Sequence, residues 1–405
     1  MTRTINFGDS EYRTNPWPTY EALRERRVTF VPEGTWDGED LYIFARYADV
    51  NEALRDRDRY SSHIRRGGNL DLPVLVNRDP PDHTRLRKLA NTGFHTKLVR
   101  DMGEQVQNVV DELVADISEK DRVEFVEAFA SALPLRVVGG MLGIPLDRKA
   151  DLRRWSQALK DGFAVAAGMD PELVPGFYED ILEFADYMGE LAQQRMGEPN
   201  RGDILGALVA EQERGDILRE ELTTIALEFI VAGHETTTSL LAGAFKALLD
   251  DRALAQRLHS APGDIPEFVD EFARLYSPNQ WLLRRARRDI RIDDVDIPEG
   301  ALIHMLIGSA NRDDAKFPNA DVLDVDRPNK KDHLAFGAGA HFCPGTVLSR
   351  LLADRAIRAL CRLRHTFSLD PLDPPRLRTR PGSFGYDHMP VLIGGDMPTP
   401  DTTRT

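Results

Sequence analysis

The segment that most constrains the fold is residues 218–250, which reads LREELTTIALEFIVAGHETTTSLLAGAFKALLD. Its apolar residues fall on nearly every side of a helix with 3.6 residues per turn. At about 1.5 Å per residue, a helix over this segment would be roughly 45–50 Å long. A helix that is apolar nearly all round is buried nearly all round, so we expect it to cross the core of the protein.

The rest of the sequence predicts a mainly α protein with a minor β part. Helical patterns cover residues 16–26, 102–118, 123–142, 148–167, 172–196, 265–276 and 345–363, and another helix follows the two prolines at 80 and 81. β-Forming residues gather at 27–32, 41–47 and 289–307. Because no internal repeat or low-complexity linker divides the chain, we expect one domain over residues 1–405, ending in a frayed tail at 395–405.

Charge and cysteine content argue against several classes of function. The 405 residues carry a formal net charge of −14, which makes nucleic acid an unfavourable general partner because phosphate binding needs a basic face. Two cysteines are too few for a disulfide framework and suit a reducing cytosol. No segment reaches the roughly 18 apolar residues of a membrane span, and the first residues lack the apolar core of a signal peptide. We therefore expect a cytoplasmic protein without a membrane partner.

The loop AFGAGAHFCPG, residues 335–345, surrounds Cys343 with three glycines. A dinucleotide-binding loop would need glycine where Phe342 stands, and a zinc site would need more ligands than one Cys and one His. A buried cysteine in a turn is the ordinary fate of a lone thiol, and it describes Cys361 on the next helix well. A fourth interpretation is a thiolate ligand to haem iron. Glycines let a loop approach a flat ring, and backbone N–H groups ahead of a helix can point at the sulfur.

This loop resembles the haem-binding signature of the cytochrome P450 family. The signature constrains six positions within ten residues, and the likeness extends from NPWPTYEALR near the N-terminus to MPVLIGG near the C-terminus. The resemblance implies the single-domain cytochrome P450 fold, with the long central helix over haem b and Cys343 as the iron ligand. It also implies haem contacts from the other residues of the signature, Phe336, Gly337, His341 and Gly345.

The same resemblance gives a role to the sequence AGHETT within the long helix. From the residues alone, Gly233 costs about 1 kcal/mol against alanine, and Thr236 could simply bond back to the carbonyl of Ala232 in a kinked helix. A zinc motif fails because Thr238 stands where H-E-x-x-H needs histidine. In the family this region faces the iron, so Ala232 and Gly233 would border the haem and leave room for dioxygen. Thr236 would hold the oxygen with a water, and Glu235 would feed protons inward.

Two further sets of polar residues match the family. Glu271 and Arg274 form an E-x-x-R pair that is uninformative alone. With Arg327, the resemblance assigns the pair to folding and haem insertion. Haem also carries two carboxylates, which need cationic partners. The residues that match the family's partners are His83, Arg87, Arg284 and His341, although His83 could instead cap a helix and Arg284 could be a solvated strand residue.

The resemblance places the substrate pocket between the loop 61–82, the 163–185 region, the central helix and the turns near 280 and 385. The residues expected to line it are Ile64, Arg65, Leu75, Phe229, Asn279, Trp281, Leu282 and Phe384. Most are apolar, as ligand sites usually are, so we expect a small to medium, largely apolar organic substrate. Arg65 could meet an anionic substrate or the phosphate of a carrier protein, or it could face water.

The reaction implied is a monooxygenation, in which dioxygen and two external electrons insert one oxygen atom, with hydroxylation as the leading outcome. Cys343 and Cys361 cannot build an iron–sulfur cluster, so the electrons must come from another protein. A group of basic residues suggests an acidic ferredoxin with its reductase; it comprises Arg85, Lys88, Lys97, Arg100, Lys330, Lys331, Arg350 and Arg355. We expect a monomer. Oxidative coupling, ring closure, dealkylation and peroxide-driven oxidation are alternatives within the fold, and a non-catalytic haem sensor is the alternative of another class.

Overall fold

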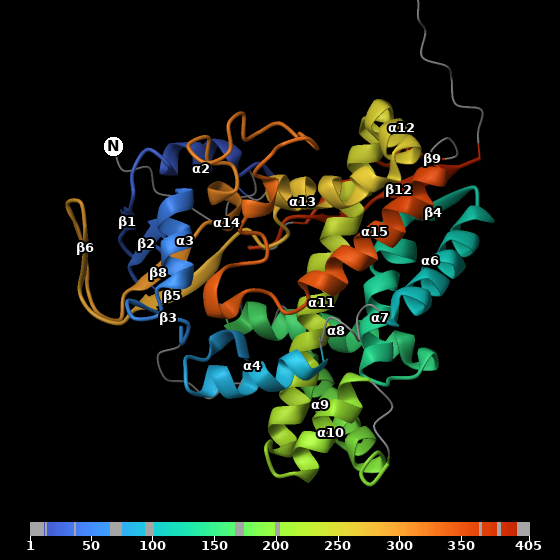
Figure 1. Ribbon diagram of the computed structural model, residues 1–405, viewed down its shortest axis with the longest axis horizontal. Coiled ribbons are helices and arrows are strands. Elements are labelled where there is room, and N and C mark those ends of the chain that lie inside the picture. Colours follow the sequence, from blue (N-terminus) through green and yellow to red (C-terminus); the bar gives the residue numbers. More distant parts are fainter. Residues whose placement is uncertain are drawn as a thin grey trace, which may run out of the picture.

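The computed structural model describes residues 12, 14–35, 38–64, 75–93, 101–166, 174–198, 203–363, 367–378 and 382–394. Helices make up most of these residues, and the largest group of strands lies at one end of the molecule (Figure 1). The α-helices are α2 (Trp17–Leu23), α3 (Tyr47–Arg55), α4 (Asp82–Gly93), α6 (Gly103–Ser118), α7 (Ala132–Met141), α8 (Lys149–Ala166), α9 (Phe177–Gln194), α10 (Ile204–Glu213), α11 (Arg219–Asp250), α12 (Arg252–Ser260), α13 (Ile265–Tyr276), α14 (Ile307–Ala310) and α15 (Thr346–Arg362). Short 3₁₀ turns include η1 (Leu75–Asn77) and η7 (Gly339–His341). The mainly α prediction is confirmed.

Helix α11 is the long central helix that the sequence predicts. Its 32 residues extend over roughly 48 Å at the usual rise per residue. The helices α7, α8, α9 and α15 pack around it, and Figure 1 shows it running through the middle of the helical region. Its first turn is capped by Glu221, whose carboxylate accepts the N–H of Leu218 at 3.0 Å. No helix among the described residues has both the length and the apolarity that a membrane span requires.

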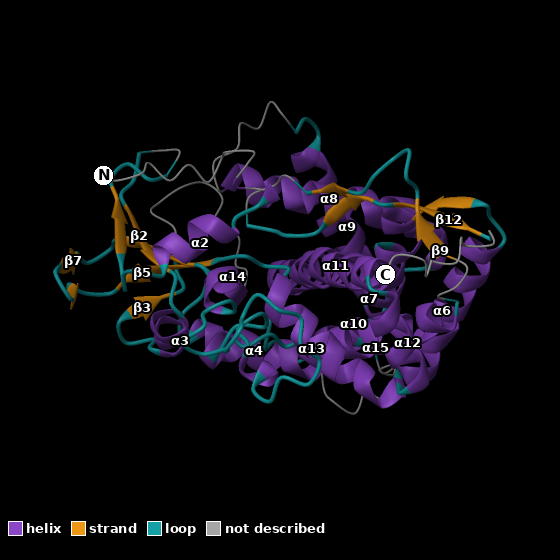
Figure 2. Cartoon of the chain, turned by 90° about the horizontal axis from the view of Figure 1, so that it is seen from above, coloured by secondary structure: helices purple, strands orange, loops and turns teal. Residues whose placement is uncertain are grey.

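The largest sheet has the strand order β1-β2-β8-β5-β3 and stands apart from most of the helices (Figure 2). Its strands are β1 (Thr29–Val31), β2 (Leu41–Phe44), β8 (Leu302–Met305), β5 (Leu282–Ala286) and β3 (Tyr60–Ser61). Strands β2 and β8 run parallel and are wholly buried, as parallel neighbours usually are. The smaller sheets are β4 (Arg122–Glu124) with β12 (Pro390–Ile393) and β9 (Phe367–Leu369), β6 (Ile290–Ile292) with β7 (Val295–Ile297), and β10 (Arg376–Leu377) with β11 (Tyr386–His388).

Most predicted elements occur, but the helix predicted over 123–142 was wrong. That segment begins in β4, continues as a π-helix over Val126–Ala130 and becomes an α-helix only at α7. Strand β4 pairs with β12, so a partner more than 260 residues away in the sequence overrides the local helical pattern. The helices α3, α10, α12 and α14 were not predicted, nor were the strands outside 27–32, 41–47 and 289–307. The expected tail at 395–405 lies outside the described residues.

The E-x-x-R pair and Arg327 lie together in the core. The side chains of Glu271 and Arg274 are fully buried and meet through two hydrogen bonds of 2.8 Å, from Nη2 to Oε1 and from Nε to Oε2. Arg327 Nε donates to Glu271 Oε1 at 3.0 Å. The remaining guanidinium groups donate to main-chain carbonyls, among them those of Asn311 and Ala320. This network ties α13 to the irregular segment that leads to the cysteine loop.

Candidate functional site

The loop around Cys343 is shaped by two glycines with left-handed backbones. Gly337 has φ +69° and Gly339 has φ +68°, values that side chains rarely permit. A Cβ atom on Gly339 would lie 2.6 Å from the carbonyl oxygen of Leu54, at the end of α3. The N–H of Cys343 donates to the carbonyl of Phe336 at 2.9 Å, which closes the loop.

The sulfur of Cys343 lies next to the N-terminus of α15. The main-chain N–H groups of Gly345 and Thr346 and the Thr346 hydroxyl stabilise a thiolate, yet burial outweighs them and raises the pKa of the Cys343 thiol. A free thiol is therefore protonated here, whereas a metal cation would deprotonate it and use the donors already in place. These donors suit a thiolate that ligates a metal. Among the described residues, no cluster of three or more His, Cys, Asp or Glu side chains suited to a metal ion occurs.

Four basic side chains gather beside this loop from three separate segments. The rings of His83 on α4 and His341 lie with centroids 4.0 Å apart. Arg87, one turn after His83, donates to the carbonyl of Phe342, and Arg284 on β5 is 5% exposed. The structure thus brings together the residues expected to bind the haem carboxylates.

The electrostatics of this basic cluster favour an anion. Burial lowers the pKa of Arg284 to about 10, and burial together with His83 and Arg284 lowers the pKa of His341 to about 3. His83 Nε2 is buried and has no hydrogen-bond partner within the described part of the chain. Carboxylates placed here would supply the missing acceptor and offset the positive charge. The residues present therefore fit haem, with its sulfur ligand on one side and its two carboxylates toward this cluster.

The AGHETT segment of α11 remains helical without a break. Thr236 Oγ1 donates to the carbonyl of Ala232 at 2.7 Å, the back-bonding that the sequence suggested. Ala232 is exposed although its helix crosses the core, so this turn borders an open space. A Cβ atom on Gly233 would lie 3.1 Å from Val138 Cγ2 of α7. Its missing side chain therefore allows α11 to pack against α7.

Glu235 is held on the other side of this turn by a buried arginine. Arg378, which follows β10, donates from Nη1 to Glu235 Oε1 at 2.6 Å and also to the hydroxyls of Ser239 and Ser383. Its Nε donates to Asp387 at 2.7 Å. Arg378 was not predicted, because neighbouring residues reveal nothing about a partner 143 positions away.

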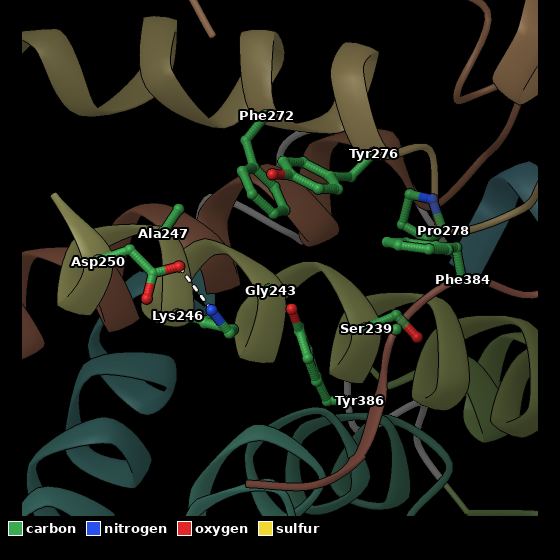
Figure 3. A pocket seen from close by; sticks show the side chains of 11 residues that line it. Ser239, Gly243, Lys246, Ala247, Asp250, Phe272, Tyr276, Pro278, Phe384 and Tyr386 are labelled. Atoms are coloured by element: carbon green, nitrogen blue, oxygen red, sulfur yellow. Dashed lines mark hydrogen bonds and ion pairs between the residues drawn. The ribbon is translucent and has the colours of Figure 1, made fainter. Parts of the chain in front are cut away.

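A pocket lies between α11 and α13, next to this Arg378 cluster (Figure 3). Ser239, which borders it, also accepts a hydrogen bond from Arg378. Figure 3 shows Phe272 and Tyr276 pointing down into it from α13 and Tyr386 lying below. Its other lining residues are Gly243, Lys246, Ala247, Asp250, Pro278, Phe384 and Gly385. Cys343 does not line it, so it is distinct from the space between the cysteine loop and α11.

The residues expected to line the substrate pocket lie in several different environments. Leu75 is buried on η1, Phe229 is buried in α11, and Ile64 accepts a hydrogen bond from Arg285. Trp281 packs edge-on against His304, next to Leu282 on β5, and Asn279 forms a β-bridge with Ser383. Phe384 stacks with Tyr276, lies tilted against Trp17 and lines the pocket of Figure 3. Arg65 lies outside the described residues.

Two polar residues of α11 were missed. His234 is buried between two hydroxyls, with Nε2 2.7 Å from Ser131 Oγ and Nδ1 2.6 Å from Ser156 Oγ. Glu228 binds two main-chain N–H groups of η1. Both could have been noticed in the sequence, because a histidine and an acid stand inside an otherwise apolar helical segment. Buried polar groups need partners, so such residues indicate specific contacts.

The expected electron-donor surface is less basic than its residues suggest. Arg85 pairs with Glu221, Lys331 with Glu267, and Arg350 with Asp270. Lys330 is buried and donates to the carbonyl of Arg327. Lys97 and Arg100 lie outside the described residues, whereas Lys88 is exposed on α4.

Several known proteins similar to this chain are named as cytochromes P450. The family model described as cytochrome P450 matches residues 265–383. Cytochrome P450 107B1 of Saccharopolyspora erythraea is 33% identical over 397 residues, covering 93% of this chain and 94% of that protein. The 6-deoxyerythronolide B hydroxylase of the same organism is 30% identical, over 98% of this chain and all of that protein. The structure of P450BioI in complex with hexadec-9Z-enoic acid ligated acyl carrier protein is similar with a TM-score of 0.86 at 26% identity, covering 95% of this chain and 99% of that chain.

Proposed function

This chain belongs to the cytochrome P450 family of oxidoreductases, and on that premise we propose that it is a haem-thiolate monooxygenase that hydroxylates a largely apolar organic substrate. One oxygen atom of dioxygen enters a C–H bond, and the other leaves as water with two electrons and two protons. One observation supports this proposal best. The Cys343 sulfur, just before α15, lies close to a basic cluster that comprises His83, Arg87, Arg284 and His341.

Cys343 is proposed as the ligand to the iron of haem b. Gly337, Gly339 and Gly345 leave the loop free of side chains, and the N–H groups ahead of α15 stabilise negative charge on the sulfur. His83, Arg87, Arg284 and His341 are proposed to bind the two carboxylates, with Phe336 beside the ring. When bound, haem supplies the redox-active iron at which dioxygen is reduced and its O–O bond is cleaved.

The protein supplies protons and excludes water. Thr236 donates its hydroxyl proton to the Ala232 carbonyl, so its oxygen lone pairs stay available to accept from a bound water. Glu235, fixed by Arg378 and Ser383, is proposed to take protons from outside and pass them toward Thr236. This acid–alcohol pair favours activation of dioxygen over a peroxide-driven reaction and over a sensor, neither of which needs a proton relay.

The substrate is proposed to be small to medium in size. Relatives include a hydroxylase named for 6-deoxyerythronolide B and a structure holding an acyl chain on a carrier protein, so both free and carrier-bound substrates occur among similar proteins. Coupling, ring closure and dealkylation use the same proton relay and remain the second candidate. An acidic ferredoxin is proposed as the electron donor. Its contact surface on this protein would comprise Lys88 and the basic residues near it.

The test is the spectrum of the holoenzyme. The reduced wild-type protein with carbon monoxide should show the red-shifted Soret band of a thiolate ligand, and Cys343→Ser should lose it. Cys361→Ser is the matched control, because Cys361 is buried near the end of α15, the helix that Cys343 precedes, and its replacement should leave the band unchanged. A Cys343→Ser protein that keeps the wild-type band would contradict the proposal. Binding of a substrate should then convert the ferric protein from low spin to high spin as the iron-bound water leaves.

A further inference from the structure

Helix α11 carries a carboxylate that is held by neutral partners. Glu228 Oε2 accepts the N–H of Leu75 at 2.8 Å, and Oε1 accepts the N–H of Val76 at 3.0 Å. Both amides belong to η1, whose chain is otherwise packed through the buried side chain of Leu75. Within the described residues, no Lys, Arg or His forms an ion pair with Glu228. The carboxylate is therefore held by two amides, and it forms no ion pair with the described residues.

Glu228 shares one side of α11 with the residues that are proposed to border the haem. It precedes the exposed Ala232 by four residues and Thr236 by eight, so the three lie along one side of the helix. Arg87 lies close to both the Cys343 sulfur and the Glu228 carboxylate. The charge of each of these groups raises the pKa of Arg87, although burial lowers it by more. The same guanidinium donates to the carbonyl of Phe342. One side chain thus links the sulfur and the carboxylate.

The charge of Glu228 is poorly compensated where it stands. Burial raises the pKa of Glu228 to about 7, although the two N–H groups and Arg87 act in the opposite direction. A carboxylate has about four acceptor positions and these N–H groups occupy two, so two remain for another donor. The proposed function assigns Arg87 to the haem carboxylates, which leaves a cation from the substrate as the partner that would offset the cost of this half-buried charge.

We propose that Glu228 is a specificity-determining residue that binds a cationic nitrogen of the substrate, so that the enzyme selects apolar compounds carrying a positively charged amine. The inference rests on the proposed function, because the space along this side of α11 must be the substrate pocket. The two N–H groups of η1 hold the carboxylate in one position, so a cationic nitrogen in the pocket would meet a fixed negative charge.

The test is a spectral titration of the ferric holoenzyme with two matched probes. One is (4-phenylbutyl)trimethylammonium, and the other is its neutral isostere with carbon in place of nitrogen. A quaternary nitrogen has no lone pair for iron, so a shift to high spin reports occupation of the pocket. We expect wild type to bind the cation at least tenfold more tightly than the isostere. Glu228→Gln should abolish this preference, which is read as the ratio of the two affinities within each protein, and Glu220→Gln, an exposed acid of the same helix, should keep it.

The pH dependence of wild type provides a second measurement that needs no variant. The charge of the quaternary probe is constant, so its affinity should fall as pH drops through about 7 and Glu228 takes up a proton. Arg87 on α4 and the amides of η1 are the groups that face Glu228, and none of them changes charge in this range. The isostere should bind equally at pH 6 and pH 8.

The outcomes separate this inference from the proposed function. Equal affinity for both probes at every pH, in a protein with the thiolate band, would overturn the inference and leave Glu228 as a tether for η1. Tighter binding of the cation that persists in Glu228→Gln would also overturn it. Loss of the thiolate band in wild type would instead overturn the proposed function.

Discussion

Arg378 Nη1 lies 2.6 Å from Glu235 Oε1, so a buried guanidinium from the C-terminal part of the chain holds the acid of the central helix. The side chain of Arg378 is 5% exposed and that of Glu235 is 18% exposed. This ion pair fixes the direction of a carboxylate that the proposed reaction needs for proton delivery, and it connects α11 to the turn that follows β10.

Replacing Arg378 should impair proton delivery without preventing reduction of the enzyme. Arg378→Met releases Glu235 from its ion pair, and we expect roughly 10- to 100-fold less product per reductant consumed, since misplaced catalytic groups lose effects of this size. Arg378→Lys should restore part of the yield. The measurement is product and hydrogen peroxide per reduced nicotinamide oxidised. Arg376→Met, at an exposed position two residues earlier, is the control. An unchanged yield in Arg378→Met would contradict a positioning role.

Removing the hydroxyl of Thr236 should uncouple electron use from product formation. In Thr236→Ala, reductant oxidation should continue, product formation should fall on the order of 100-fold, and peroxide should accumulate. Thr238→Ala is a matched control, because Thr238 Oγ1 makes the same kind of bond to the His234 carbonyl, at 2.8 Å, but is buried. If both variants lost product equally, the effect would belong to helix geometry and the hydroxyl of Thr236 would have no special role.

Breaking the buried ion network should destabilise the protein. Glu271→Gln leaves Arg274 and Arg327 without their carboxylate, and loss of one partner of a buried pair costs about 3–5 kcal/mol. The free energy of unfolding in urea measures this change. Arg291→Gln breaks an exposed pair with Asp296 and should cost less than about 1 kcal/mol. A loss in Glu271→Gln no greater than in Arg291→Gln would show that the network contributes little.

Acid should destabilise the fold through His304 on β8. Burial lowers the pKa of His304 to about 3, below its ordinary value of 6.5. The unfolded chain therefore binds a proton that the folded chain excludes, and stability falls as pH drops below about 6.5, by up to about 1.4 kcal/mol per pH unit for this residue. His304→Leu should reduce the slope of unfolding free energy against pH between 4 and 6. His259→Leu, at an exposed site on α12, should keep the wild-type slope.

Salt should slow electron transfer from an acidic ferredoxin. Raising ionic strength from 0.01 to 0.15 M shortens the screening length from about 30 Å to about 8 Å, so steering by exposed cations weakens. Stopped-flow reduction should slow accordingly, and Lys88→Glu should slow it further at low salt. Lys246→Glu, which lies beside the pocket of Figure 3, serves as the control. Reduction that is insensitive to salt would contradict the proposed docking surface.

The sequence predicted the parts of the fold that depend on local pattern. Helix α13 was predicted with its observed bounds, and α11 within one residue, because their amphipathic or apolar periodicity is strong. The helix predicted over 123–142 was wrong in its first part, because β4 is stabilised by pairing with β12. Local periodicity cannot reveal this pairing. Loop glycines and the basic residues around Cys343 were found by resemblance. Arg378 and Glu228 were missed, because their importance arises from partners 143 and 153 positions away.

Gly339 permits the carbonyl of Leu54 to approach where a Cβ atom would lie at 2.6 Å. The cysteine loop therefore rests on α3, which belongs to the sheet end of the molecule, while its other end enters α15 and the helical region. Neither part alone holds Cys343 in place. A chain whose helices had formed but whose sheet end had not docked would have helical circular dichroism without an ordered loop. The thiolate band would then report the last stage of folding. It would appear after the helical circular dichroism signal is complete.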